Sequence, residues 1–257
     1  MTGPLLVAET LSKRFGAIAA VRDVSFEIGE GEALAIVGES GSGKTTLLHL
    51  ISGLVEPDAG AVRYRMRDGA TRALGHLSEA ERRGLMRADW GFVHQDAARG
   101  LRMNVSAGGN IGERLMALGA RHYGRIRETA AEWLARVEIP ADRIDDRPGT
   151  YSGGMRQRLQ IARNLVTAPR LVFMDEPTGG LDVSVQARLL DLLRGLIAEM
   201  GLAVVLVTHD LAVARLLSNR IIVMKSGEVV ESGLTDRVLD DPQAPYTQLL
   251  VSSVLAA

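Results

Sequence analysis

Compact apolar runs and amphipathic segments alternate along most of the chain. The runs at residues 33–37, 171–174 and 202–208 are apolar at nearly every position, which is typical of strands buried on both faces of a parallel sheet. Shorter apolar runs predict further strands at residues 4–8, 24–28 and 60–65, and a hairpin of residues 221–225 with 228–231. Apolar positions at helical spacing predict helices after residue 43 and over residues 183–200, 211–217 and 246–254, and a capping box of Ser78 and Glu81 predicts a short helix over residues 78–86. This alternation predicts an α/β fold with a largely parallel sheet and helices on both faces.

The sequence pattern changes in the middle of the chain. From about residue 97 to residue 150 strands are hard to find, whereas residues 111–118 predict a helix. An amphipathic helix is predicted by the apolar positions Ile126, Ala130, Trp133, Leu134 and Val137. Ser152 is placed to cap another helix that runs through Val166, and the polar residues 67–77 predict a loop. We therefore expect one domain over residues 1–257, with an α/β core of residues 1–96 and 165–257 and a helical subdomain of residues 97–164.

The composition of the chain excludes several classes of protein function. The chain has 257 residues and a formal net charge of −1, which argues against a general nucleic-acid binder, because such proteins usually carry a strong basic excess. It has no cysteine, which excludes disulfides, thiolate catalysis and cysteine-ligated metal clusters. Residues 1–8 lack the basic start and apolar core of a signal peptide, and no apolar run approaches the roughly 20 residues that span a bilayer. We expect a cytoplasmic protein without direct membrane insertion.

A glycine-rich loop follows the apolar run at residues 33–37 and precedes a predicted helix. Residues 38–45 fit the pattern G-x-x-x-x-G-K-[ST], in which backbone N–H groups and the helix N-terminus surround phosphate oxygens. This pattern assigns Lys44 to the β- and γ-phosphates of ATP and the Thr45 hydroxyl to Mg²⁺. The alternative, a loop that only links a strand to a helix, is disfavoured by this context. The predicted nucleotide-binding residues are Gly38, Glu39, Ser40, Gly41, Ser42, Gly43, Lys44, Thr45 and Thr46.

Two acidic residues and a histidine stand at the ends of later apolar runs. Asp175 and Glu176 follow the run at residues 171–174, where one carboxylate can hold Mg²⁺ and the other can polarise the attacking water. His209 follows the run at residues 202–208 and is placed to contact a γ-phosphate. Taken alone, either pattern also fits an acidic loop start or an exposed histidine. Their position downstream of the glycine-rich loop favours the catalytic interpretation.

A second anion site is predicted at the start of the helix that Ser152 caps. Ser152, Gly153 and Gly154 supply a hydroxyl, backbone N–H groups and a helix N-terminus. With Met155 and Arg156 they match the signature of the ABC ATPase family, which the chain resembles over essentially its whole length and in motif order. Met155 stands where glutamine is commonest in that family.

The resemblance to ABC ATPases adds three residues to the site. Gln95 is similar to the family's Q-loop glutamine, Asp182 to its D-loop aspartate, and Phe15 to the aromatic residue that stacks on adenine. Gly179 and Gly180 depart from the family pattern, in which serine and alanine usually precede the Leu-Asp pair.

The family resemblance implies a P-loop nucleotide-binding domain with a RecA-like mixed-sheet core, a β-subdomain and a helical subdomain. Two subunits would pair head to tail, with each ATP between one phosphate loop and the partner's signature, so that ATP favours the closed state. It implies catalysis by Lys44, Gln95, Glu176 and His209, with Glu176 as general base and His209 as γ-phosphate contact. Its implied Mg²⁺ ligands are Thr45, Gln95 and Asp175. Whether the dimer is homomeric or contains a related ATPase stays open.

Segments outside these motifs indicate which subgroup of ABC ATPases the chain resembles. The resemblance is strongest to ATP-binding subunits of bacterial carbon–phosphorus lyase systems, which serve phosphonate use, at residues 105–116, 137–140, 164–167, 173–182 and 233–241. It implies docking on a soluble lyase core complex. Arg82, Arg83 and Arg87, which flank the region of Gln95 in the sequence, are the predicted contacts, and a solvated basic face is the alternative interpretation. Residues 241–250 also resemble the ATPases of peptide and nickel importers. The alternatives are therefore an energising subunit of a membrane importer for peptides, nickel or phosphonates, and a mainly structural or regulatory role in which ATP-driven dimerisation matters and turnover is negligible.

Overall fold

The computed structural model describes residues 3–255, and its internal contacts divide the chain into two compact units. The first unit takes in the described residues of Met1–Arg82 and Gly201–Ala257, and the second is Arg83–Met200. Within the described residues, no helix is both long and apolar enough to cross a membrane.

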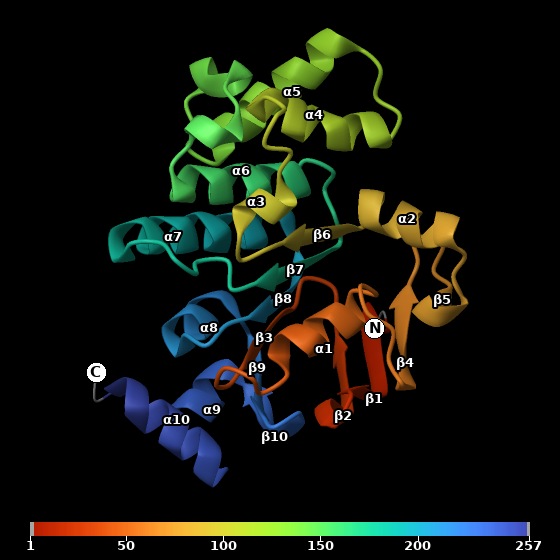
Figure 1. Cartoon of the computed structure of the whole chain (residues 1–257), viewed down its shortest axis with the longest axis vertical. Coiled ribbons are helices and arrows are strands. Elements are labelled where there is room, and N and C mark those ends of the chain that lie inside the picture. The colour runs from red at the N-terminus through yellow and green to blue at the C-terminus, as the bar shows by residue number, and fades with distance from the viewer. Residues whose placement is uncertain (1–2, 256–257) are drawn as a thin grey trace. The chain divides into compact units, whose positions relative to one another are not determined.

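An antiparallel sheet forms one part of the first unit (Figure 1). Its strand order is β2-β1-β4-β5, and the N-terminal strands are longer than the apolar runs predicted, because bulges let each strand continue past its irregular positions. Residues 67–77 are not a loop throughout, since they contain β5 and a short 3₁₀-helix, η1. The bounds are β1 (Leu6–Phe15), β2 (Ile18–Ile28), β4 (Ala59–Arg65), β5 (Thr71–Ala73) and η1 (Leu74–His76).

Parallel strands form the other part of the first unit. β3 pairs in parallel with both β8 and β9, and β9 forms the predicted hairpin with β10. Every residue of β3 and β8 is buried, as their uninterrupted apolar runs predict. The strands are β3 (Ala33–Val37), β8 (Ala203–Val207), β9 (Arg220–Lys225) and β10 (Glu228–Leu234). The helices are α1 (Lys44–Ile51), α8 (Leu211–Leu217), α9 (Thr235–Asp240), which the sequence pattern did not predict, and α10 (Pro245–Leu255).

The second unit is mainly helical, and Figure 1 shows α4, α5 and α6 gathered within it. Its two strands, β6 (Trp90–Val93) and β7 (Leu171–Asp175), pair in parallel. β6 was not predicted, since it is short and contains Gly91. The helices are α3 (Ala97–Gly100), α4 (Ala107–Ala117), α5 (Tyr123–Arg136), α6 (Gly153–Leu165) and α7 (Val183–Met200), with 3₁₀-helices η2 (Ala141–Asp145) and η3 (Pro148–Thr150).

Helix α2 (Glu79–Ala88) opens with the capping box that the sequence predicted. The Ser78 backbone N–H donates to Glu81 Oε2 at 2.9 Å, and the Glu81 N–H donates to Ser78 Oγ at 3.3 Å. The Ser78 hydroxyl donates a third hydrogen bond to Glu81 Oε2, at 2.7 Å. Hydrogen bonds from Ser78 and the charge of Arg72 hold the pKa of Glu81 below its ordinary value, so the carboxylate that caps α2 is ionised at neutral pH.

Candidate functional site

The phosphate loop (residues 38–45) joins β3 to α1 in the first unit. Gly38, Gly41 and Gly43 have φ angles of 147°, 80° and 103°, in the region that favours glycine. A Cβ on Gly38 would collide with the carbonyl oxygen of Met224, and one on Gly43 with that of Ala20. The loop therefore lies directly against the neighbouring backbone, and Gly38 and Gly43 are required for this approach.

Lys44 is the buried centre of this loop. The residue is 6% exposed, and Nζ donates to the carbonyl oxygens of Gly38 at 2.8 Å and Glu39 at 2.7 Å. Ser42 Oγ is buried and has no hydrogen-bond partner within the described chain. Because buried polar groups normally have partners, a buried cation beside an unsatisfied hydroxyl fits a phosphate-binding loop.

His209 and Phe15 belong to the same unit. The Thr208 N–H donates to Ile36 O at 3.2 Å, so the ends of the parallel strands β3 and β8 meet at one edge, with exposed His209 just beyond β8. Asp210 caps α8 by accepting from Ala212 N at 2.8 Å. Phe15 ends β1 and is 52% exposed, and Lys13 Nζ lies 5.8 Å from the centre of its ring.

Gln95 and Glu176 meet in the second unit, beyond the ends of the parallel strands β6 and β7. Gln95 Nε2 donates to Glu176 Oε2 at 3.0 Å. Asp175 is the last residue of β7, and Glu176 has a φ of 43°, which is uncommon for a residue with a side chain. Such strained backbone positions cluster where a side chain has a functional direction.

Gly179 makes room for this contact. A Cβ at position 179 would lie 3.0 Å from Gln95 Nε2 and 3.2 Å from its Cγ, which is tighter than ordinary packing. The departure from the usual serine therefore has a physical consequence, since the Gln95 side chain would have to shift by a few tenths of an ångström to admit a Cβ at this position. Gly180 has a φ of 75°, so a residue with a side chain would be strained there.

Replacing Gly179 by alanine is expected to lower the ATPase rate about three- to tenfold, because the methyl group displaces the Gln95 amide from Glu176. Steady-state turnover measures this effect. Gly195→Ala is the matched control, since a Cβ at that position on α7 meets no atom within 4 Å. If the loss acts through the amide, it disappears in a Gln95→Ala background, and a loss that persists there would contradict this explanation.

The signature residues open α6 in the same unit. Ser152 Oγ accepts from Met155 N at 3.3 Å, which confirms the predicted cap. A Cβ on Gly154 would collide with Val185 of α7, so this glycine allows α6 to pack closely there. Asp182 is exposed, and its carbonyl accepts from Gln186 N at 2.8 Å at the start of α7.

Three buried side-chain amides of α6 hold the strand that leads to Gln95. These residues were not identified from the sequence. Gln160 exchanges hydrogen bonds with the backbone of His94, accepting from its N–H at 2.7 Å and donating to its carbonyl at 3.0 Å. Gln157 donates to the same carbonyl at 3.2 Å, and Asn164 bonds both backbone groups of Phe92 at 3.0 Å. The available signal was the spacing of residues 157, 160 and 164, which places three amides on one helix face. The signature helix thus holds the backbone immediately before Gln95.

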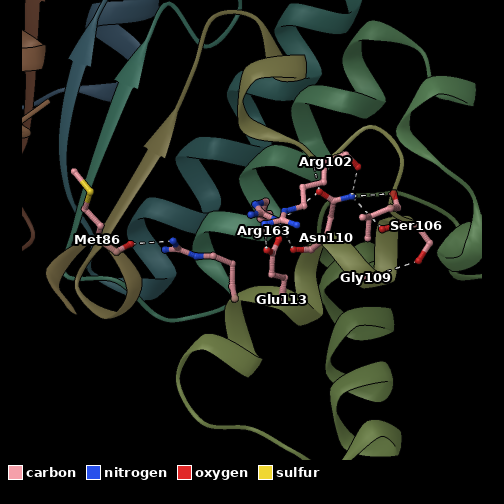
Figure 2. A network of polar contacts seen from close by, with 9 residues as sticks. Met86, Arg102, Ser106, Gly109, Asn110, Glu113 and Arg163 are labelled. Carbon is pink, nitrogen blue, oxygen red and sulfur yellow. Dashed lines mark hydrogen bonds and ion pairs between the residues drawn. The ribbon is translucent and has the colours of Figure 1, made fainter. Parts of the chain in front are cut away.

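A second polar network joins α6 to α4, as Figure 2 shows. Arg163 Nη1 donates to Asn110 O at 2.7 Å and to Glu113 Oε2 at 2.9 Å, while Arg102 pairs with Glu113 Oε1 at 2.8 Å. On α4, Arg114 donates to the carbonyls of Met86 and Trp90, at 2.9 Å and 3.0 Å. Burial, with the nearby charge of Arg163, lowers the pKa of Arg114 to about 10, so it stays charged at neutral pH.

Oxygen donors of the kind that Mg²⁺ prefers are present in each of the two units. Among the described residues, no group of three or more histidine, aspartate or glutamate side chains could hold a metal ion by itself. Mg²⁺ is usually held by one or two carboxylates and substrate phosphates. The first unit offers the Thr45 hydroxyl, and the second unit offers the Asp175 carboxylate and the Gln95 amide oxygen.

Comparisons with known proteins agree with these features. Residues 21–179 match the model of the ABC transporter family. The chain is 67% identical over 255 residues to the putative phosphonates utilization ATP-binding protein PhnK of Escherichia coli strain K12, covering 99% of each. It is 36% identical to the dipeptide transport ATP-binding protein DppD of Bacillus subtilis strain 168, covering 93% of this chain and 72% of DppD.

Two solved structures have the same fold. A dimeric ATP-binding cassette in a post-hydrolysis state with bound ADP and Pi is 33% identical, with a TM-score of 0.79 over 90% of this chain and 98% of that one. A cassette from Clostridium perfringens, part of an ABC transporter complex, is 27% identical, with a TM-score of 0.79 over 93% of this chain and 91% of that one.

Proposed function

The chain belongs to the ABC transporter family of ATP-hydrolysing cassettes, and we propose that it serves phosphonate utilisation by docking on a soluble carbon–phosphorus lyase core complex. The observation that carries the proposal is the 67% identity, over nearly the full length of both chains, to a phosphonates utilization ATP-binding protein. In this proposal the ATPase is cytoplasmic, and its nucleotide cycle opens, remodels or resets the core.

The proposed roles of the site residues follow from their chemistry. Lys44 and the N–H groups of the phosphate loop bind the β- and γ-phosphates of ATP, and Phe15 stacks on adenine. Thr45, Asp175 and the Gln95 amide would hold Mg²⁺, which would neutralise charge on the phosphate oxygens.

Hydrolysis in this proposal is an attack of water on the γ-phosphorus. The bond to the β–γ bridging oxygen breaks, ADP leaves, and Glu176 accepts the proton of the water. The contact with Gln95 Nε2 holds the Glu176 carboxylate in place, and His209 contacts the γ-phosphate.

We propose that the working unit is a head-to-tail dimer of cassettes, either of two copies or with a related ATPase. A dimeric structural relative with bound ADP and Pi supports this arrangement. Ser152, Gly153, Gly154 and Met155 then contact the partner's nucleotide, and Asp182 contacts the partner subunit. Residues 97–164 act as the helical signature subdomain of one ABC domain over residues 1–257, with residues 1–96 and 165–257 as its core.

Of the three arginines proposed to meet the core, two have the required exposure. Arg82 is half-buried, pairs with Glu56 Oε1 at 3.7 Å and donates to Leu74 O at 3.4 Å, which gives it a role within its own unit. Arg83 and Arg87 are exposed and four residues apart, so they share one face of α2. This face fits an acidic surface of the partner, and Arg82 supports the helix.

The proposal is tested by affinity purification from cells grown on a phosphonate. Tagged protein carrying Glu176→Gln, purified with ATP and Mg²⁺ and analysed by mass spectrometry, is expected to bring down soluble lyase subunits. Recovery of a multi-spanning permease instead would overturn the docking proposal. It would favour the second candidate, an importer ATPase for peptides, nickel or phosphonates, to which the identity with DppD points.

Charge reversal of both Arg83 and Arg87 to glutamate is expected to reduce recovery of the core at least about tenfold, because like charges would then face each other at the interface. ATP affinity is expected to stay unchanged. The matched control reverses Arg125 and Arg194, which are exposed arginines on α5 and α7. Full recovery of the core by the Arg83 and Arg87 variant would exclude this face of α2 as the docking surface.

A further inference from the structure

The C-terminal helix α10 reaches the phosphate loop through one side chain. Tyr246, the second residue of α10, accepts a hydrogen bond at its hydroxyl oxygen from the Glu39 backbone N–H at 3.1 Å. The two residues are 207 positions apart in the sequence and lie in the same unit. The hydroxyl therefore acts on the backbone of the loop itself.

The peptide group between Gly38 and Glu39 is held at both of its polar atoms. Its N–H, from Glu39, donates to the Tyr246 hydroxyl, and its carbonyl, from Gly38, accepts from Lys44 Nζ at 2.8 Å. The carbonyl of Glu39, in the next peptide group, accepts from the same ammonium at 2.7 Å. Peptide groups are planar, so the group between Gly38 and Glu39 cannot rotate at its N–H without also moving the carbonyl that Lys44 contacts. Tyr246 thus orients the segment that places the Lys44 ammonium.

Tyr246 is itself fixed by its surroundings. The residue is 8% exposed and belongs to a buried cluster with Val37, at the end of β3, and Val223 of β9. Lys225 Nζ lies 4.8 Å from the centre of the tyrosine ring, within cation–π distance. A tyrosine packed in this way has one accessible position for its hydroxyl.

The segment before α10 is anchored independently. Glu231 of β10 accepts hydrogen bonds from the backbone N–H groups of Gln243 at 2.8 Å and Ala244 at 3.0 Å. These two bonds fix the entry of the chain into α10, and with it the position of Tyr246. The hydroxyl therefore reaches Glu39 from a rigid support.

We propose that Tyr246 is a positioning residue for ATP binding, which holds the phosphate loop in the shape that presents Lys44 to the phosphates. The proposal rests on the proposed role of that loop in binding ATP. It gives α10 a role in ATP binding, although this helix lies outside the sequence motif of the phosphate loop.

Tyr246→Phe removes the hydroxyl and leaves the packed ring in place. We expect the KM for ATP and the Kd of ATP to rise roughly fivefold, because the Glu39 N–H loses its acceptor. The kcat at saturating ATP stays within about twofold, since bound phosphates then hold the loop themselves. A general loss of folding would lower the active fraction instead and would not change KM.

Tyr64→Phe is the matched control, because Tyr64 is a fully buried tyrosine on β4 of the same unit. It is expected to leave the Kd of ATP unchanged, and thermal unfolding of both variants checks that they are folded. A Tyr246→Phe protein with wild-type Kd and KM, in a preparation where Lys44→Ala abolishes binding, would overturn the role of Tyr246. A wild-type protein that binds no ATP would overturn the proposed function, and this inference with it.

Discussion

Replacing Glu176 by glutamine is expected to lower the kcat of ATP hydrolysis at least about 100-fold while ATP still binds. Glutamine has nearly the same shape, and its amide oxygen can still accept from Gln95 Nε2, which lies 3.0 Å from Glu176 Oε2. It cannot accept the proton of the attacking water, and general base catalysis contributes about 10²- to 10⁴-fold. Single-turnover and steady-state assays of phosphate release measure the loss.

The control for this change is Glu199→Gln on α7. Glu199 is largely exposed and pairs with Arg136 at 2.9 Å, so its replacement removes a carboxylate of the same unit without touching the pair of Gln95 and Glu176. Its turnover is expected to equal that of the wild type. A Glu176→Gln protein that hydrolyses ATP at the wild-type rate would remove Glu176 from the mechanism.

The same variant also tests the dimer. If ATP bridges two cassettes only in the closed state, blocking hydrolysis makes the closed state accumulate, because ATP shifts the equilibrium and is no longer consumed. Size-exclusion chromatography with ATP and Mg²⁺ is expected to show the Glu176→Gln protein at twice its monomer mass. A variant that binds ATP and remains monomeric would mean that closure needs the related ATPase or the core.

The fold was predictable wherever burial leaves a simple pattern. β3 and β8 are buried at every position, so their apolar runs mark them directly. β6 has only four residues, one of them glycine, and resembles a loop in the sequence. β5 has three residues, none of them buried, so pairing with β4 rather than burial defines it. Such short strands form because they pair with neighbouring strands, and the pattern of a single sequence does not show which segments will pair.

In the site as well, contacts between residues that are close in the sequence were predictable and contacts between distant residues were not. The glycines and Lys44 of the phosphate loop are predictable because strand, loop and helix are consecutive in the chain. The bond from Glu39 to Tyr246 joins residues 207 positions apart, and the bond from His94 to Gln160 joins residues 66 positions apart. Each partner is an ordinary tyrosine or glutamine in its own segment, so only the packed structure identifies its role.

Replacing Lys44 by alanine is expected to weaken ATP binding at least about 100-fold. The ammonium is buried, and it is the charged donor that the loop would present to the β- and γ-phosphates. A hydrogen bond to a charged group is worth about 1.5–3 kcal/mol, so losing one or two of them accounts for a loss of roughly this size. Isothermal titration calorimetry with ATP and Mg²⁺ measures it.

The unliganded loop is expected to change as well, since the carbonyls of Gly38 and Glu39 both lose the donor that draws them together. Arg194→Ala is the charge-matched control, because it removes one positive charge from an exposed position on α7 and is expected to bind ATP normally. If Lys44→Ala were to bind ATP within about threefold of the wild type, the ammonium would act only as a clamp on its own loop. The phosphates would then be held by the backbone N–H groups and the start of α1, and the glycines would be the principal determinants of affinity.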